Sequence, residues 1–251
     1  MKQLKTWVCA VFVGLGGVAN AMAADITVSA AASLTNAFQE IGKQFEKDHP
    51  GDRVLFNFGS SGQLVQQIVR GAPVDVFASA DQESMDKAQK EGSIDRASRR
   101  DFVRNALVLI VPADSRLPMR ELRDVVQPDV KKIAIGNPDS VPAGRYAKAA
   151  LEKAGLWGAL QDRFINTVNV RQALDYVARG EVDAGFVYRS DAQLMPARVK
   201  TALPLEVPQP ILYPVAVVRG GGNQKGGAAF VEYLNKAIAQ EILTRYGFAR
   251  P

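Results

Sequence analysis

Four turns of the sequence combine small or hydroxyl residues with the start of a helical pattern, directly after a strand-like run. The residues concerned are Ser33 and Thr35 in "AAASLTNAF", Ser60 and Ser61 in "FGSSGQL", Ala143 in "NPDSVPAGRY", and Asn169 and Val170 in "TVNVRQAL". The first N–H groups of a helix have no partner inside the helix, and the helix dipole favours negative charge at that end. The chemistry that these residue types can perform is therefore the binding of an anion by hydrogen-bond donors.

Taken singly, each turn has a simpler explanation, because Ser, Thr and Asn commonly cap helix N-termini. Four such turns at the ends of successive strands favour one shared site over four separate caps. The "GSSG" turn is the strongest, since one serine is enough for a cap and its glycines let the backbone approach a ligand closely. Ser60 and Ser61 are adjacent and can exchange the ligand role, whereas Thr35 and Asn169 are accessory candidates.

Tyr188 is a further candidate, because it ends the apolar run "GFVY" close to a point where the chain is expected to cross between two parts of the fold. Its hydroxyl could reach a ligand in a cleft there. The alternative is a half-buried strand tyrosine, which has an apolar ring and a polar tip.

Residues for acid–base, nucleophilic or metal-dependent catalysis are scarce. His49, the single histidine, lies in the turn "KDHPGD" and is expected to be a solvated loop residue, which leaves no histidine for a Ser-His-Asp triad. Cys9 is the single cysteine and lies in the N-terminal segment, so the rest of the chain has no thiol nucleophile and no thiolate metal ligand. We therefore predict a binding protein without catalytic residues, bound metal cation or cofactor. A secreted α/β hydrolase that uses a serine is the alternative from another functional class.

The N-terminal segment is typical of a secretory signal peptide. Lys2 and Lys5 precede an apolar run from Trp7 to Val18, and "ANAMA" supplies small residues for cleavage. We expect residues 1–24 to form this peptide, with cleavage after about Ala23 or Ala24, and a periplasmic mature protein. The apolar run is too short for a membrane-spanning helix.

The charge of the chain is mildly positive, at +5. Removal of Lys2 and Lys5 from the 31 basic residues leaves 29 against 26 acidic ones, a net charge of +3. The basic residues are scattered among the acidic ones without interleaved aromatics, which is not typical of a nucleic-acid surface. We expect a monomer that binds no nucleic acid and whose weak positive field slightly favours an anionic ligand.

The elements that must position the four turns alternate between strand and helix patterns. One series runs through "DITVSAAA", "DRVLFNFG" and "VDVFASA", and a second through "KKIAIGN", "RFINTV" and "DAGFVYRSDA". Two such blocks predict an α/β protein with two doubly wound lobes, and ligands of such folds bind at the carboxyl ends of parallel strands. A late strand, "YPVAVV", and one last helix are surplus to the second block and return to the first lobe. We expect lobe I at residues 25–104, lobe II at 105–191 and the return at 192–251.

The segments "AAASLTNAFQEI", "GSSGQLVQQIVRGAPVDVFASADQ", "VPAGRYAKAAL" and "YPVAVV…YGF" closely resemble the periplasmic molybdate-binding proteins of bacterial ABC importers. The resemblance covers essentially the whole mature chain. It implies a type II periplasmic-binding-protein fold, with parallel-dominated mixed sheets in two lobes joined by two crossover strands. It also implies a molybdate or tungstate ligand and delivery to the membrane permease of an ABC importer.

The ligand positions of this family fall on Ser33, Ser61, Ala143, Val170 and Tyr188. Molybdate, tungstate and sulfate only accept hydrogen bonds near neutral pH, so a site made of donors suits them. A phosphate monoanion still carries a proton, so a site for it needs a hydrogen-bond acceptor. Asp139 is an acceptor close in sequence to the third turn, which weakens the argument against phosphate. Molybdate and sulfate differ in size rather than in bond count, and binding proteins for sulfate or phosphate remain alternatives.

Overall fold

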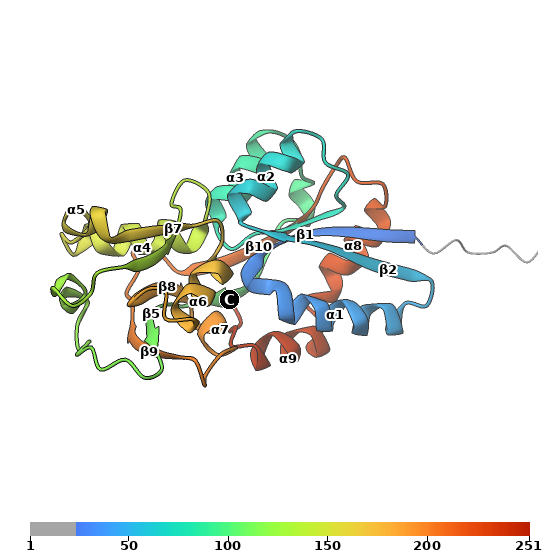
Figure 1. Cartoon of the computed structure of the whole chain (residues 1–251). Coiled ribbons are helices and arrows are strands. Elements are labelled where there is room, and N and C mark those ends of the chain that lie inside the picture. Colours follow the sequence, from blue (N-terminus) through green and yellow to red (C-terminus); the bar gives the residue numbers. More distant parts are fainter. Residues whose placement is uncertain (1–23) are drawn as a thin grey trace, which may run out of the picture.

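The computed structural model describes residues 24–251, which form two lobes that lie side by side (Figure 1). Each lobe is built on one five-stranded sheet with helices packed against it. The predicted signal peptide and Cys9 lie outside the described residues, apart from Ala24, which begins the first strand. Within residues 24–251, no helix is both long and apolar enough to span a bilayer.

The first lobe has the strand order β2-β1-β3-β10-β4. Helices α2 and α3 cover one face of its sheet, and α1, α8 and α9 cover the other (Figure 1). Its elements are β1 (Ala24–Ala31), η1 (Ala32–Leu34), α1 (Thr35–Asp48), β2 (Asp52–Gly59), α2 (Ser61–Val69), β3 (Val76–Ala78), α3 (Gln82–Lys90), η2 (Arg96–Ser98), β4 (Arg100–Asn105), β10 (Ile211–Val217), α8 (Gln224–Tyr233) and α9 (Ala237–Arg245).

The second lobe repeats the plan, with the strand order β7-β6-β8-β5-β9. Helix α6 packs on β6, β8 and β5, and α4 also packs on β6 and β8. Its elements are β5 (Leu107–Pro112), η3 (Leu122–Val126), β6 (Ile133–Gly136), α4 (Pro142–Lys153), α5 (Trp157–Leu160), η4 (Gln161–Arg163), β7 (Phe164–Thr167), α6 (Val170–Ala178), β8 (Ala184–Tyr188), α7 (Arg189–Ala192) and β9 (Val199–Pro204).

The predicted α/β class with two mixed sheets is confirmed. In each sheet, two strand pairings are parallel and two are antiparallel, so parallel pairs make up half of the pairings rather than most of them. The antiparallel pairs arise where β10 returns to the first sheet and where β5 enters the second. The three parallel strands of each sheet end at one edge, and the turns described above follow those ends.

The apolar periodicity of the sequence correctly marks the helices that flank the sheets. Phe38, Ile41 and Phe45 of α1 are fully buried, and the rings of Phe38 and Phe45 lie 5.9 and 5.4 Å from that of Phe230 in α8. Glycine ends several helices as the sequence predicts. Gly180, directly after the last turn of α6, has φ +69°, a left-handed conformation that side chains with a Cβ rarely adopt.

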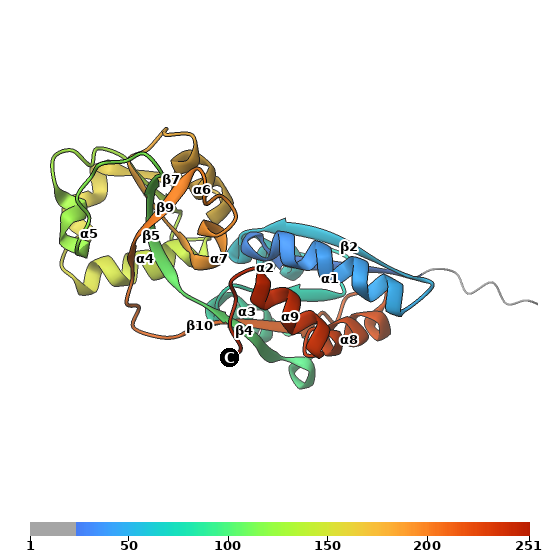
Figure 2. The ribbon, with the colours of Figure 1, turned by 90° about the horizontal axis from the view of Figure 1, so that it is seen from below.

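The chain crosses between the lobes twice (Figure 2). The first crossing is a single residue, Ala106, between β4 and β5. The second spans residues 205–210, between β9 and β10. Strands β4 and β10 are neighbours in the first sheet and β5 and β9 in the second, so both crossings run side by side.

Two details of the C-terminal part differ from expectation. The sequence predicts the return to the first lobe from residue 192, but β9 pairs with β5 in the second sheet, so the return follows Pro204. Strand β9 is a sheet edge and half of its residues are exposed, which gives it little apolar signal in the sequence. The single last helix that the sequence predicts is two helices, because Lys236 has an extended backbone (φ −69°, ψ 151°) between α8 and α9.

Candidate functional site

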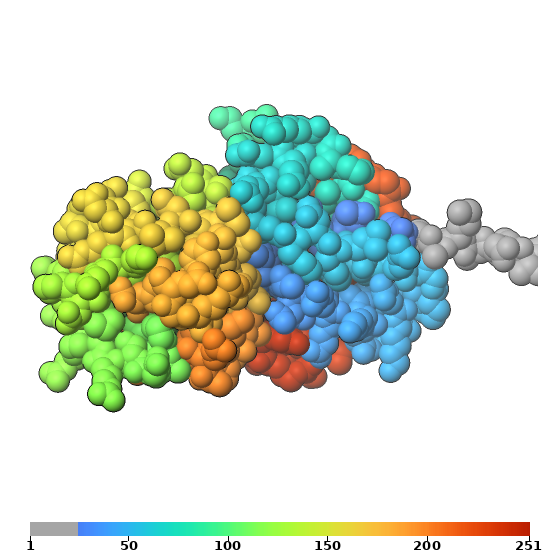
Figure 3. All heavy atoms as spheres, in the orientation of Figure 1, coloured from blue at the N-terminus to red at the C-terminus, as the bar shows by residue number. Residues whose placement is uncertain are grey.

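A small cavity lies where the two lobes meet, and the lobes touch along this boundary in the space-filling view (Figure 3). Its volume is about 10 Å³, the space that one water molecule needs. The wall combines residues of the four turns with the ends of neighbouring strands. It consists of Ala31, Ala32, Ser33, Gly59, Ser60, Ser61, Ala80, Val141, Pro142, Ala143, Asn169, Val170 and Tyr188.

The five residues expected to bind the ligand all lie on this wall, and so do two of the three accessory candidates. Thr35 does not line the cavity: its Oγ1 donates to the carbonyl oxygen of Ala32 at 2.7 Å, at the start of α1. Asn169 lines the cavity and also caps α6, because its Oδ1 accepts from the N–H of Gln172 at 3.0 Å. The fold therefore brings together turns that are up to 137 positions apart, from Ser33 to Val170.

Ser33 belongs to a chain of hydroxyl groups in the first lobe. Its Oγ lies 3.0 Å from Oη of Tyr213, and Nδ2 of Asn105 donates to the same Oη at 3.2 Å. Because Tyr213 already accepts from Asn105, its own proton can point to Oγ of Ser33. The hydroxyl proton of Ser33 is then free to donate into the cavity.

Ser61 is oriented by a backbone group in a similar way. The N–H of Ala80 donates to Oγ of Ser61 at 2.9 Å, which leaves the proton of that hydroxyl available. The neighbouring Ser60 is 3% exposed, and its Oγ has no hydrogen-bond partner among residues 24–251. A buried hydroxyl without a partner is costly, so its presence on the wall points to a polar ligand.

The second lobe contributes backbone donors. Pro142 is the first residue of α4 and has no N–H, so Ala143 carries the first N–H group of that helix. Val170 is the first residue of α6, and its N–H therefore has no partner within the helix. Both residues are buried on the cavity wall, so two helix starts of the second lobe face the cavity.

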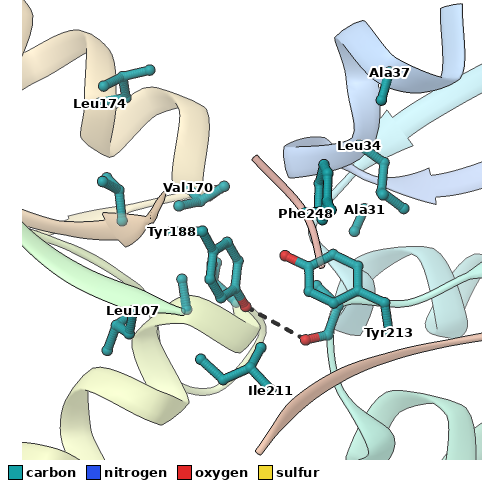
Figure 4. Packing of buried hydrophobic residues seen from close by; sticks show 14 of the residues in the cluster. Ala31, Leu34, Ala37, Leu107, Val170, Leu174, Tyr188, Ile211, Tyr213 and Phe248 are labelled. Carbon is teal, nitrogen blue, oxygen red and sulfur yellow. Dashed lines mark hydrogen bonds between the residues drawn. The ribbon is translucent and has the colours of Figure 1, made fainter. Parts of the chain in front are cut away.

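Tyr188 lies at the end of β8, and its ring packs near that of Tyr213 from the other lobe (Figure 4). The ring centroids are 5.7 Å apart at 64°. The Oη of Tyr188 donates only a long bond, 3.5 Å, to the carbonyl oxygen of Ala80. Burial raises the pKa of Tyr188 well above its ordinary value, so the phenol keeps its proton and remains a donor.

The cavity wall is almost free of charge. Among the described residues that line it, Tyr188 is the one ionisable residue, and none is a lysine, arginine, aspartate or glutamate. Asp139, close in sequence to the third turn, is exposed and does not line the wall. Within residues 24–251, no three His, Cys, Asp or Glu side chains are grouped as metal ligands. The site can therefore bind an acceptor-rich anion through neutral donors alone.

Polar contacts join the lobes at residues close in sequence to the cavity wall. Arg145 of α4 donates from Nε and Nη2 to Oδ2 of Asp81 at 2.9 and 2.6 Å, the strong charge-assisted type of hydrogen bond. The N–H of Gly62 donates to the carbonyl oxygen of Ser140 at 3.0 Å. These contacts describe a closed arrangement of the two lobes around the cavity.

Sequence reasoning missed several residues of this site. Ala80 and Tyr213 orient the two serine hydroxyls. Ala80 stands in the turn between β3 and α3, which is not among the four candidate turns, and Tyr213 lies within strand β10. Tyr213 lies in the "YPVAVV" segment, and the predicted return of this segment to the first lobe was the one sign that it could reach the site.

His49 lies at the end of α1, as expected for a residue in a turn. Its Nδ1 lies 3.0 Å from the carbonyl oxygen of Phe45, and its ring stacks on the Phe45 ring.

Comparisons with known proteins agree with this architecture. A family model described as bacterial extracellular solute-binding protein matches residues 26–249. The molybdate-binding protein ModA of Escherichia coli is 42% identical over 233 residues, covering 89% of this chain and 88% of that protein. ModA of Haemophilus influenzae is 35% identical over 254 residues, covering 99% of each. The solved periplasmic molybdate-binding protein of Azotobacter vinelandii has a TM-score of 0.79 and 27% identity, covering 90% of this chain and 99% of that one. The chain therefore belongs to the family of bacterial extracellular solute-binding proteins.

Proposed function

We propose that this protein captures molybdate or tungstate in the cavity between its lobes and delivers the anion to the permease of an ABC importer. The observation that carries the proposal is the uncharged wall of donors supplied by both lobes, including the unpartnered Oγ of Ser60. Ser33, Ser61 and Tyr188 donate from hydroxyls, and Ala143 and Val170 donate from the backbone. The molybdate-binding relatives support the same ligand.

The chemistry of the wall favours fully ionised oxyanions. Four oxygen atoms that only accept hydrogen bonds match a wall that mainly donates them, and each bond to a charged oxygen is stronger than a neutral one. A phosphate monoanion must donate its proton to an acceptor, and the wall contains no carboxylate. Molybdate and tungstate differ from sulfate in the size of the anion. The spacing of the lobes sets the distances between the donors, and these distances then select the anion by its size.

The proposed cycle follows from the two-lobed fold. An open form binds the anion on one lobe, the second lobe closes over it, and the permease recognises the closed form. The protein acts as an exported monomer after cleavage near Ala23 or Ala24, and binding is its whole activity. Lobe I is residues 25–104 with the C-terminal return, and lobe II extends from residue 105 to the end of β9.

Calorimetry on the purified mature protein tests the ligand directly. Molybdate and tungstate are expected to bind one per chain, sulfate much more weakly, and phosphate not measurably. Equal competition by sulfate would contradict the assignment of the ligand. Turnover of an ester substrate that disappears in Ser33→Ala would instead favour the hydrolase alternative.

Removal of a single serine hydroxyl is expected to weaken molybdate binding. Ser33→Ala and Ser61→Ala each remove one donor to a charged oxygen, which corresponds to ~1–3 kcal/mol of binding free energy. Ser60→Ala tests whether its unpartnered hydroxyl also binds the anion. Titration calorimetry of each variant gives the dissociation constants.

Ser98→Ala is the matched control for these variants. Ser98 is a buried serine of the same lobe whose Oγ donates to the carbonyl oxygen of Asp95 at 2.7 Å, and it does not line the cavity. Its loss is expected to lower stability and leave the anion affinity unchanged. Wild-type affinity in both Ser33→Ala and Ser61→Ala would disprove the site assignment.

Anion affinity is expected to stay constant from about pH 7 to pH 10. Tyr188 is the ionisable group on the wall, and an ordinary tyrosine has a pKa of about 10. Burial raises the pKa of Tyr188 well above that value, so its proton stays in place across this range. Calorimetric titrations at several pH values check this. A loss of affinity centred well below pH 10, and absent in Tyr188→Phe, would show that the tyrosine ionises earlier than its burial implies.

A further inference from the structure

An ion pair whose carboxylate is fully buried lies beside the cavity wall. Asp191 of α7 is completely buried, and its Oδ1 lies 2.6 Å from Nε of Arg171, the second residue of α6. A buried ion pair is costly to remove from water, and well-packed apolar side chains of similar volume often stabilise a fold as well or better. A contribution to stability is therefore a weak explanation for the presence of this ion pair. The contacts of Asp191 and Arg171 suggest a different role.

Within the second lobe, the pair connects two of the proposed ligand residues. The Oδ2 of Asp191 accepts from the backbone N–H of Tyr188 at 3.2 Å, where β8 ends. Its other oxygen holds Arg171, which directly follows Val170 in the chain. One carboxylate thus fixes the end of β8 relative to the first turn of α6, so the Tyr188 hydroxyl and the Val170 N–H approach the cavity in one geometry.

Across the lobe boundary, the same guanidinium reaches a third ligand residue. Nη2 of Arg171 donates to the carbonyl oxygen of Ser33 at 3.0 Å, and Nη1 donates to Oδ1 of Asn36 at 2.7 Å. The three contacts of Arg171 use the fixed fork of a guanidinium, which a lysine ammonium cannot reproduce. The Ser33 turn is therefore tied to the second lobe at a point next to the ligand space.

We propose that Asp191 and Arg171 are positioning residues of the anion site, which hold the donors of Ser33, Val170 and Tyr188 in register when the lobes close. Neither residue lines the cavity. Asp191 orients Arg171 within the second lobe, and Arg171 then holds the Ser33 turn of the first lobe. The inference rests on the proposed function, since it assigns these residues a role toward the same anion.

A purely electrostatic role would give a different result. If the positive charge of Arg171 attracted the anion, lysine would replace arginine without loss, and removal of the Asp191 charge would strengthen binding. If the pair positions the donors, Arg171→Lys and Asp191→Asn both weaken binding, because each breaks the same set of contacts. The sign of the Asp191→Asn effect therefore separates the two roles.

The experiment measures molybdate affinity by calorimetry, together with the melting temperature with and without molybdate. Wild type is expected to bind, and Arg171→Lys and Asp191→Asn are expected to bind about tenfold to a hundredfold more weakly. The double variant is expected to be little weaker than either single variant, because all three remove one coupled unit. If Asp191→Asn does not fold, Arg171→Lys still decides the outcome, since its side chain is 22% exposed.

Arg163→Lys is the matched control. Nη1 of Arg163 donates to the carbonyl oxygens of Val126, Gln127 and Val130, all within the second lobe and away from the cavity wall. It is expected to lower the melting temperature while the affinity stays within about twofold of wild type. Wild-type affinity in Arg171→Lys, or tighter binding in Asp191→Asn, would overturn the positioning role. A wild-type protein that binds no molybdate would overturn the proposed function and this inference with it.

Discussion

Val170→Pro is expected to weaken molybdate binding by at least a hundredfold while the protein remains folded. Proline removes the N–H group of the first residue of α6, which we propose as a ligand donor, and places a ring carbon where the hydrogen was. The lost bond to a charged oxygen accounts for ~1.5–3 kcal/mol, and the steric contact adds to it. Calorimetry gives the affinity and thermal unfolding reports the fold.

The backbone around Val170 is compatible with this substitution. Proline is favoured at the first position of a helix, and α4 already begins with Pro142. Asn169 is extended (φ −161°, ψ 172°), the type of conformation that a residue before proline prefers. The change therefore removes a donor without breaking the helix.

Val170→Ala is the control for the side chain, because it keeps the N–H and also loses buried methyl groups. Its affinity is expected to stay within about threefold of wild type, with a lower melting temperature from the cavity that it creates. Equal affinity of the proline and alanine variants would show that the Val170 N–H does not bind the anion.

Gly62→Ala is expected to weaken molybdate binding by about tenfold to a hundredfold without lowering the melting temperature of the free protein. A Cβ at this position would lie 2.6 Å from the carbonyl oxygen of Ser140 and 2.8 Å from its Cα, both backbone atoms of the other lobe. The lobes must then stay further apart, and the competent closed form becomes less populated. Alanine also favours the helix α2 in which it stands, by up to about 1 kcal/mol.

Gly158→Ala provides the matched control for this change. Gly158 lies in the short helix α5, and a Cβ there would have no atom within 4 Å. Its affinity is expected to equal that of wild type. If Gly62→Ala also binds like wild type, then the closed contact between Gly62 and Ser140 is not required for tight binding.

Much of the fold follows from local patterns that the sequence displays openly. Alternation of strand and helix, and glycines such as Gly180 after the helices, depend on neighbours in the chain and predict both sheets. The edge strand β9 is not predicted from local patterns, because exposed side chains such as Lys200 interrupt its apolar pattern. The break at Lys236 is also hidden, since both flanking segments are helical.

The candidate site is predictable in its residue types and not in its connections. Ser33, Ser61 and Val170 stand in turns whose donors are visible from the sequence, because a helix start leaves its N–H groups unpaired. The partners that orient them, such as Tyr213, come from distant segments, and the pairing of β10 with β3, the neighbour of β1, brings that tyrosine to Ser33. The same holds for Arg171, whose neighbour in sequence is Val170 but two of whose three contacts, to Ser33 and Asn36, lie in the other lobe.

The one-residue crossing at Ala106 restricts how the lobes can move. Consecutive Cα atoms are about 3.8 Å apart, so the lobes cannot slide past each other or separate at this point. The second crossing contains Pro208 and Pro210, whose φ angles are nearly fixed. We therefore expect the lobes to move mainly by rotation about one axis near these crossings. Under the proposed function, the angle between the lobes then sets the radius of the anion that the donors of both lobes can contact together.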